Sequence, residues 1–373
     1  MENNTDIKVS VIMPIYNACD YIKPAMDSVL YQTLSEIEVI CVDDGSTDHS
    51  LKILKEYQAR DSRIRIVTET NAGPALARNN GMRRARGEYI AFLDADDFFE
   101  PTFLEALYEI AKRDDLDIAI SRYDIYNSRR SRFEPVPRTE HSDIYLPGKV
   151  TSKNEHPDHI LMSTVGSAWN KLFKRSFIED KQLSFLADVR IYEDVYFVVT
   201  AMSLAERVGK VFDVLIHHRI HSEQSRAKMF KKYYCQIPVV YRKIKEFLMQ
   251  NGMYAPLSVS FLNLSASRCY KIFNLLSSEE KEDFWNMFHN DYADILGWYG
   301  HDASNFDSEE IFEFVANVQM YDYALYKKRN EKGVKIEADK VNQNIFIAKK
   351  KKRIKNLFKK IFNKKQKNKE FSK

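Results

Sequence analysis

The stretch GEYIAFLDADDFFEP, Gly87–Pro101, joins a run of apolar residues to a cluster of carboxylates. Residues 89–93 have the composition of a short, buried β-strand. Three aspartates follow at once: Asp94, Asp96 and Asp97. Carboxylates that lie this close repel one another unless a positive charge lies among them. The stretch therefore predicts a strand that ends at a site for a cation.

Three segments upstream also have the pattern of short, buried strands: residues 8–13, 38–44 and 64–69. Between the strands, apolar residues recur at helical spacing, as in Ile22, Met26 and Val29. Alternating strands and helices predict an α/β fold with a parallel, doubly wound sheet. Ligands of such sheets gather at the carboxyl ends of the strands. Three polar turns fall there: residues 14–17, 43–46 and 94–97.

The pattern becomes mixed after residue 100. We expect strands at residues 117–127 and 211–221, and an apolar helix that begins near residue 190. Residues 127–160 are typical of an insertion or loop, and a further loop is expected at 167–178. The predicted organisation is an α/β domain with a mixed sheet (residues 1–226), an α-helical C-terminal module (227–346) and a basic tail (347–373).

The composition of the 373 residues excludes several classes of protein. Four cysteines without a CxxC pair argue against a disulfide framework and a zinc site. No signal peptide is recognisable, and no apolar run approaches the roughly 20 residues of a membrane span. The tail holds 13 Lys or Arg and one Glu, whereas the whole chain has a net charge of +4. The remainder is therefore acidic, and we expect a cytoplasmic protein without a nucleic-acid partner.

The triplet Asp94-Ala95-Asp96 suggests a metal site. In an extended segment, side chains two positions apart point to the same side, so both carboxylates are expected to face one ligand. Carboxylate oxygens suit Mg²⁺ or Mn²⁺, which completes its coordination shell with water and substrate phosphate. The alternative is a surface loop, because such triplets are common. The buried strand before the triplet favours the metal site.

Four segments stand in an order and spacing that resemble family 2 of the inverting glycosyltransferases, which have the GT-A fold. They are VSVIMPIYNACDYIKPAMDSVLYQT (9–33), EVICVDDGSTDHS (38–50), NAGPALARNNGMRRARGEYIAFLDADD (71–97), and WNKLFKRSFI with YEDVYF (169–178 and 192–197). The resemblance covers about residues 7–225. It implies a nucleoside diphosphate sugar, in particular a UDP-sugar, as donor. It also implies a saccharide or lipid-linked acceptor in surface polysaccharide or glycolipid assembly.

The resemblance places the donor across the strand ends. Pro14, Tyr16 and Asn17 resemble the wall of the base site, with Tyr16 placed to stack on the base. Asp43 and Asp44 resemble a pair that contacts the ribose and the imide N–H of uracil, with Asp44 on the imide. The alternatives are core packing for Tyr16 and a turn position for Asp44, since Asp-Gly pairs form turns readily.

Further donor contacts follow from the same resemblance. Arg78 resembles a residue that faces the nucleotide, and Trp169 a platform for a sugar ring; a surface arginine and a buried tryptophan are the alternatives. The resemblance implies Mn²⁺ or Mg²⁺ between Asp96 and the diphosphate. Asp94 is expected on the ribose or on a metal-bound water. Which aspartate touches the ion stays open.

An inverting transfer needs a base that deprotonates the acceptor hydroxyl. The resemblance assigns this role to Asp194, with Glu193 as the second choice, where Tyr192 replaces the glycine of the commoner motif. A helix N-cap is the alternative for these carboxylates. In HHRIHSEQSR (217–226), Arg219 is expected to close over the diphosphate and His221 to join the metal shell.

The tail segment KKKKRIKNLFKKIFNKK (349–365) has an apolar stripe among its lysines. The stripe recurs at i, i+3, i+4, i+7 and i+8: Ile354, Leu357, Phe358, Ile361 and Phe362. This pattern predicts a basic amphipathic helix on an anionic membrane surface, and hence peripheral membrane association. A disordered tail, or one that meets nucleic acid nonspecifically, is the alternative.

Two other functions remain to be weighed against a glycosyltransferase. A sugar nucleotidyltransferase shares the sheet class, but no Gly-rich loop with Lys or Arg follows the first strand. A non-catalytic relative that only binds sugar nucleotides is disfavoured, because the carboxylates at positions 94, 96, 193 and 194 are all present.

Overall fold

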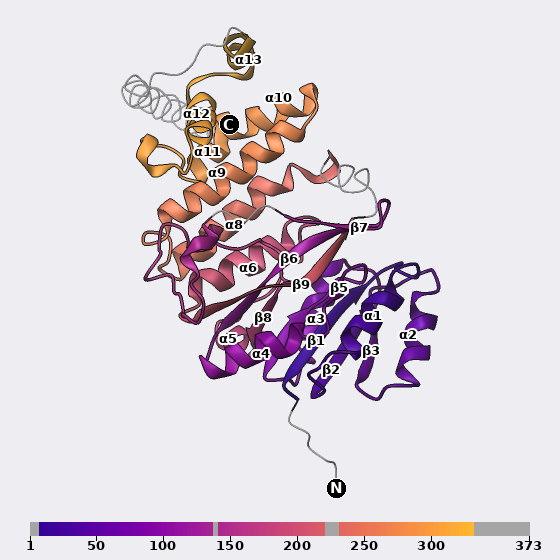
Figure 1. The fold of residues 1–373 in the computed structure, drawn as a ribbon. Helices are drawn as coiled ribbons and strands as arrows, with labels where there is room; N and C mark the ends of the chain where they lie inside the picture. The colour runs from indigo at the N-terminus through magenta and orange to yellow at the C-terminus, as the bar shows by residue number, and fades with distance from the viewer. Residues whose placement is uncertain (1–6, 137–140, 221–230, 332–373) are drawn as a thin grey trace, which may run out of the picture. The chain divides into compact units, whose positions relative to one another are not determined.

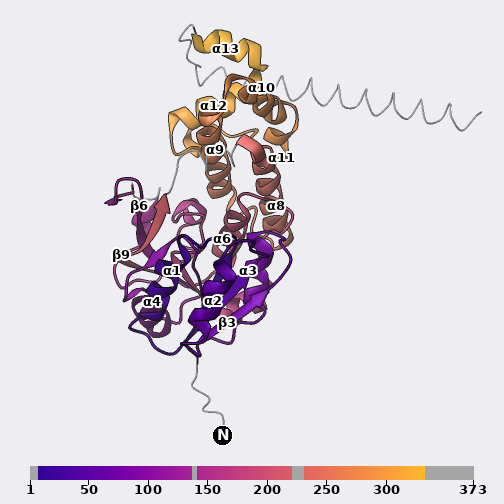
Figure 2. The ribbon, with the colours of Figure 1, turned by 90° about the vertical axis from the view of Figure 1, so that its right-hand side faces the viewer.

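The computed structural model describes residues 7–136, 141–220 and 231–331 (Figure 1). The chain divides into two compact units between Ser260 and Phe261. This division falls after the predicted boundary at residue 226, because helix α8 (Gln236–Gln250) belongs to the first unit. There α8 packs beside helix α6 (Glu193–Leu204), as both views show (Figure 2). Tyr196 of α6 and Phe247 of α8 meet edge to face, with ring centroids 6.3 Å apart.

The first half of the sheet is parallel, with the strand order β3-β2-β1-β4. The strands are β1 (Val9–Ile15), β2 (Ile37–Asp43), β3 (Ile64–Thr68) and β4 (Tyr89–Phe92). The connecting helices are α1 (Ile22–Leu30), α2 (Ser50–Gln58) and α3 (Pro74–Met82). β1, β2 and β4 are buried almost throughout, which explains their near-continuous apolar sequences. All four predicted strands are confirmed.

The second half makes the sheet mixed, as predicted. Its strands are β5 (Phe98–Phe99), β6 (Ile118–Asn127), β7 (Arg132–Glu134), β8 (Lys171–Lys174) and β9 (Val208–Ile220). β8 is antiparallel to both β4 and β6, whereas β9 is parallel to β6 and antiparallel to β5. Helix α4 (Phe103–Arg113) follows β5.

The predicted loop at 167–178 is only partly correct. Lys171–Lys174 forms β8, and helix α5 (Arg175–Asp180) follows it directly. The strand forms because it has a partner on each side, β4 and β6. In the described part of the predicted insertion at 127–160 lie β7 and a short 3₁₀ turn, Ser142–Ile144, and a further 3₁₀ turn begins at its end, Ile160–Met162.

The aspartate cluster lies on a turn. β4 ends at Phe92, and the Asp97 N–H donates to the Asp94 carbonyl oxygen at 3.1 Å. The expectation that an extended segment aligns Asp94 and Asp96 is therefore wrong. The chain turns here because β5 begins at Phe98 and pairs antiparallel with β9.

The described part of the second unit is helical, as predicted. Its elements are α10 (Ser278–Met287), a π-helical turn (Phe288–Tyr292), α11 (Ala293–Ile295), a 3₁₀ turn (Ala303–Asn305), α12 (Glu309–Met320) and α13 (Tyr323–Glu331). Helix α9 (Ser258–Leu275) spans the division between the units. Trp285, Phe288 and Trp298 are buried in the second unit. None of the described helices combines the length and apolar character that crossing a membrane requires.

Candidate active site

Arg78 lies between carboxylates that come from distant parts of the chain. Its side chain projects from α3 and is 7% exposed. Nη2 donates to Asp94 Oδ1 at 2.6 Å, and Nη1 donates to Glu193 Oε1 at 3.0 Å. Burial by itself would lower the pKa of Arg78, but the charges of Asp94 and Glu193 raise it above its ordinary value. A buried arginine is thus one positive charge among the carboxylates.

Glu193 and Asp194 occupy the first turn of α6. Tyr192 precedes them in a left-handed backbone conformation, with φ +64°. The N-cap alternative does not hold, because Tyr192 is the cap residue and no side chain caps the helix there. Instead, Asp194 Oδ1 accepts the N–H of Val195 at 2.8 Å. Ser167 is a second polar neighbour of Asp194.

The pKa values of both acids are raised. Burial is the main cause for Glu193, whose pKa rises to about 7. The neighbouring negative charge of Asp194 also raises the pKa of Glu193, whereas the positive charge of Arg78 lowers it. Burial also raises the pKa of Asp194, and the positive charge of Arg78 again opposes the rise. A higher pKa makes a carboxylate a stronger base. Because Arg78 binds Glu193 directly, Asp194 is the better candidate for a base.

Asp43 and Asp44 hold the loops at the end of β2. Asp44 Oδ1 accepts the N–H of Ala72 at 2.7 Å, and Oδ2 accepts the N–H of Gly73 at 2.9 Å. Asp43 Oδ1 accepts the N–H of Ser46 at 3.3 Å. Asp44 is 3% exposed, so it supports the loop before α3 and presents little surface of its own. Contacts of this pair with ribose and uracil stay a prediction.

Tyr16 and Asn17 follow β1, whose Pro14 pairs with Val42 of β2. The Tyr16 side chain is 51% exposed, which argues against the core-packing alternative. Asn17 has a left-handed backbone, with φ +49°. Its Oδ1 accepts the N–H of Thr47 at 2.8 Å, so Asn17 ties the end of β1 to the loop after β2. An exposed aromatic ring on a fixed turn is suited to stacking.

Asp97 anchors the aspartate turn to β9. It is fully buried, accepts the Arg219 N–H at 2.8 Å and lies 3.0 Å from His218 Nδ1. Burial raises the pKa of Asp97 to about 6, while His218 acts against this rise. Arg219 Nε donates to the Asp96 carbonyl oxygen at 2.7 Å. Arg219 therefore lies at the aspartate turn, as its predicted role near the diphosphate requires.

Trp169 is buried beside this anchor. It is 6% exposed, and its ring stacks on His218 with 5.6 Å between centroids and an angle of 9° between planes. Tyr123 contacts it edge to face at 4.7 Å. The structure favours the buried-tryptophan alternative, because little ring surface is left for a sugar.

Two buried polar residues have an environment that differs from what their sequence suggests. Lys171 is fully buried and donates to the carbonyl oxygens of Val165 and Ser167 at 2.8 and 2.7 Å. Burial holds the pKa of Lys171 well below the ordinary value of 10.5, although the negative charge of Asp194 acts to raise it. Its signal was a lysine inside the apolar run WNKLF. The second residue is His217: the HH pair suggests solvent-facing strand residues, but His217 is 5% exposed and bridges Asp124 at 2.5 Å and Glu100 at 2.7 Å.

The aspartate turn supplies some, but not all, of the oxygen ligands that a divalent cation such as Mg²⁺ needs. Arg78 holds Oδ1 of Asp94, so Oδ2 of Asp94 and the Asp96 carboxylate are the candidate ligands. Among the described residues, no third His, Cys or carboxylate ligand gathers with these two. Phosphate and water oxygens would have to complete the shell, as is usual for Mg²⁺. His221, the third predicted ligand, lies outside the described residues.

The fold and site together define the class of protein. A doubly wound mixed sheet with carboxylates gathered at its strand ends is the arrangement of the GT-A transferases. Residues 10–180 match the family described as glycosyl transferase family 2. The chain is also 34% identical over 247 residues to "Putative glycosyltransferase EpsH" of Bacillus subtilis (strain 168), a match that covers 65% of this chain and 70% of the relative. The chain therefore belongs to glycosyl transferase family 2 and is a glycosyltransferase.

Two other similarities extend over more of the chain. It is 27% identical to the "Poly(ribitol-phosphate) beta-glucosyltransferase" of Bacillus spizizenii, over 75% of this chain and 44% of the relative. The crystal structure of S. aureus TarS 1-349 in complex with UDP superimposes with a TM-score of 0.64 at 20% identity, covering 88% of this chain and 92% of that one. The second similarity supports the GT-A fold and the helical C-terminal region.

Proposed function

We propose that this glycosyltransferase transfers a hexosyl or N-acetylhexosaminyl unit, with inversion, from a UDP-sugar to a saccharide or lipid-linked acceptor. The observation that carries this proposal is the convergence of the Asp94 turn and the Glu193–Asp194 pair on Arg78. The UDP bound by S. aureus TarS supports the choice of donor. The relative that acts on poly(ribitol-phosphate) supports a role in surface polysaccharide synthesis.

The residues divide the chemistry between them. Asp194, with its raised pKa, takes the proton of the acceptor hydroxyl as that hydroxyl attacks the anomeric carbon. Arg78 keeps the Glu193 side chain in place, so that a second carboxylate does not compete for the proton. The exposed Tyr16 ring stacks on the donor base, and Arg219 lies at the diphosphate end of the site.

A divalent cation, Mn²⁺ or Mg²⁺, belongs to the proposal. Asp96 and Asp94 Oδ2 would hold it, and it would neutralise charge on the nucleoside diphosphate that leaves. The role of the tail at the membrane also belongs to the proposal, because residues 347–373 lie outside the described part of the chain.

The alternative functions are less well supported. Membership of glycosyl transferase family 2 argues against a sugar nucleotidyltransferase. A non-catalytic relative would not need two acids with raised pKa values beside a buried arginine.

Release of nucleoside diphosphate from a panel of UDP-sugars tests the proposal. We expect release from one or a few of these donors with Mn²⁺, and loss of release in excess EDTA that added Mn²⁺ restores. Asp96→Asn should lower release by at least about 100-fold, on the scale of other single groups that stabilise a leaving charge. Asp180→Asn, at an exposed position on α5, is the matched control and should match the unmodified chain. Absence of metal-dependent release from every donor would contradict the proposed function.

A further inference from the structure

Phe185 lies among the elements that carry the charged cluster around Arg78. It belongs to the connection between α5 and α6, where the chain forms neither helix nor strand, and it is 2% exposed. Its ring contacts Phe92, the last residue of β4, with 5.1 Å between the centroids. It stacks on Phe197 of α6 at 4.2 Å, with 12° between the ring planes. This one loop residue therefore packs against both elements that position the carboxylates of the site.

The ring of Phe185 also covers the guanidinium group of Arg78. The guanidinium carbon lies 5.3 Å from the ring centroid, within the roughly 6 Å over which an aromatic face attracts a cation. The N–H groups at the edge of the same guanidinium donate to Asp94 and Glu193. A planar guanidinium that donates along its edge leaves its faces for packing on an aromatic ring. Arg78 is therefore held both at its edge, by carboxylates, and at its face, by Phe185.

The side chain of Asn79 fixes the backbone of Phe185. Nδ2 of Asn79 donates to the Phe185 carbonyl oxygen at 2.9 Å, and Oδ1 accepts the Phe185 N–H at 2.8 Å. Both hydrogen bonds are buried, and Asn79 directly follows Arg78 on α3. A buried backbone segment without a strand partner needs such bonds, because unpaired N–H and C=O groups are costly away from water. The neighbour of Arg78 on the same helix thus sets the position of the ring that covers it.

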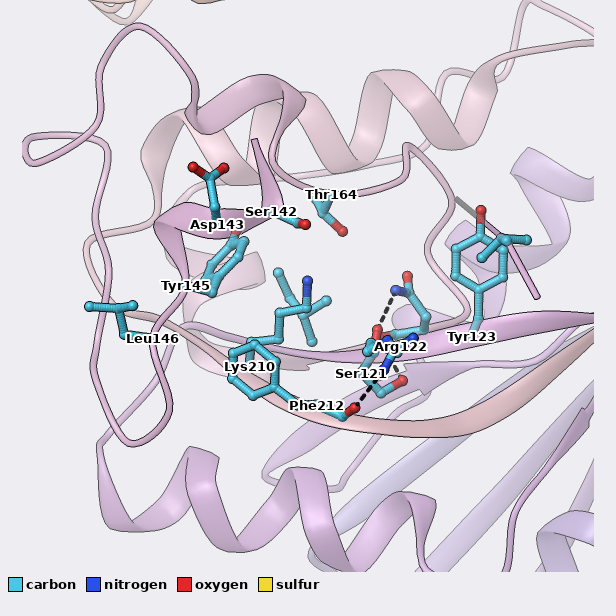
Figure 3. Close-up of a pocket in the computed structure, with 13 residues that line it drawn as sticks. Ser121, Arg122, Tyr123, Ser142, Asp143, Tyr145, Leu146, Thr164, Lys210 and Phe212 are labelled. Carbon is cyan, nitrogen blue, oxygen red and sulfur yellow. Dashed lines mark hydrogen bonds between the residues drawn. The ribbon is translucent and has the colours of Figure 1, made fainter. Parts of the chain in front are cut away.

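A cation that lies over an aromatic ring does not by itself indicate a role in the reaction. Lys210 Nζ lies 5.1 Å from the centroid of the Tyr145 ring, and both residues line a pocket over β6 and β9 (Figure 3). Among the described residues that line this pocket, none belongs to the cluster around Arg78. The contact of Phe185 differs, because its cation also binds two carboxylates from distant segments. Phe185 can therefore influence these carboxylates through Arg78.

We propose that Phe185 is a positioning residue for the transfer reaction: its ring holds the Arg78 guanidinium in place between the two carboxylates and excludes water from them. This proposal rests on the proposed function. Interactions between charges are stronger where water is excluded. The covered guanidinium therefore keeps Glu193 bound and leaves Asp194 to act as the base. Phe185 acts through Arg78 and is not itself a catalytic residue.

Two leucine variants of the full chain test the proposal through donor hydrolysis, in which water takes the place of the acceptor. Phe185→Leu removes the ring that covers Arg78. Phe173→Leu is the matched control, because Phe173 of β8 is also buried and contacts the same two rings, Phe92 at 6.0 Å and Phe197 at 5.1 Å. We expect Phe185→Leu to lower kcat by about tenfold or more, since small displacements of positioned groups are costly, and to leave KM for the donor within about twofold. Phe173→Leu should keep both values within about twofold.

A fluorinated ring at the same two positions tests the contact with the cation while it preserves the packing. Pentafluorophenylalanine in place of Phe185 keeps a planar ring of similar size, but fluorine withdraws the negative charge from the face that attracts the guanidinium. We expect kcat to fall by about threefold or more, as loss of a cation–ring contact allows. The same replacement of Phe173 should leave kcat unchanged. Thermal unfolding verifies that each protein is folded.

Equal effects on kcat at positions 185 and 173, with either the leucine or the fluorinated residue, would overturn the proposal, because Phe185 would then be an ordinary core residue. A higher KM without a lower kcat would overturn it too, since that result indicates a loss of donor binding alone. If the unmodified chain hydrolyses a donor and the two positions behave alike, the positioning role is refuted and the proposed function stands. If the unmodified chain hydrolyses no donor, the proposed function fails, and the positioning role fails with it.

Discussion

Arg78 and Glu193 are 115 positions apart in the chain, and Nη1 of Arg78 donates to Glu193 Oε1 at 3.0 Å. Because the same guanidinium binds Asp94, it fastens the start of α6 to the end of β4. Two carboxylates from distant parts of the chain therefore share the one positive charge of Arg78.

Arg78→Met is expected to destabilise the fold and abolish transfer. It leaves Asp94 and Glu193 without their shared partner, and breaking a buried ion pair from one side costs about 3–5 kcal/mol. Urea unfolding and donor hydrolysis measure the two effects. Arg83→Met, at an exposed position just after α3, should change the free energy of unfolding by no more than about 0.5 kcal/mol. Equal stability of the two variants would contradict the bridging role.

Asp194→Asn should lower the rate of transfer by about 10²–10⁴-fold, the usual contribution of a general base. Glu193→Gln should lower it less, because Arg78 already occupies that side chain. Binding of UDP, measured by calorimetry, should persist in both variants. The assignment fails if folded Asp194→Asn transfers sugar at the rate of the unmodified enzyme.

The pH dependence of stability should carry a contribution from Glu193. Its pKa rises from 4.5 to about 7 on folding, so the folded state retains a proton that the unfolded state loses between these values. The free energy of unfolding must therefore fall as the pH rises through this interval. Glu193→Gln should reduce this fall by on the order of 1–3 kcal/mol.

Unfolding by urea at pH 5 and pH 8 measures the difference. Glu109→Gln, a substitution at an exposed position on α4, is the control. Its free energy of unfolding should change with pH as that of the unmodified chain does. If the free energy of unfolding of Glu193→Gln fell with pH as much as that of the unmodified chain, the carboxyl group of Glu193 would not gain its proton on folding.

Removal of residues 347–373 should abolish binding to liposomes that contain anionic lipid. Each lysine near such a surface contributes about 1 kcal/mol. Sedimentation with anionic and with neutral liposomes measures the effect, and binding of the full chain to the anionic ones alone is expected. A truncated chain that still sediments with anionic liposomes would refute the anchor.

Local patterns predicted the fold well. The apolar run at residues 89–93 and the turn at Gly45 mark strand ends directly, because burial on both faces and turn geometry each restrict the choice of residue. Helical periodicity also identified α8 as a helix. It contains no information about what the helix packs against, so the first unit was predicted to end too early.

Such local patterns could not predict which residues from distant parts of the chain bind one another. Arg78 stands in an ordinary helix sequence, and nothing nearby reveals that its partner is Glu193. Lys171 looks like a strand residue at the surface, yet backbone carbonyl groups from its own loop allow it to be buried. The general region of the site followed from where parallel strands end, whereas the pairing of side chains within it is visible only in the folded structure.

Tyr192 has a consequence for protein engineering. Its left-handed backbone costs a non-glycine residue roughly 1–2 kcal/mol, whereas glycine adopts it freely but loses more freedom on folding. Tyr192→Gly would relieve this backbone strain but would also remove the contact of the Tyr192 ring with Tyr241, whose ring centroids lie 6.3 Å apart. A library that varies the residue beside the candidate base therefore also varies a contact between α6 and α8, because Tyr192 is the cap residue of α6 and Tyr241 lies on α8.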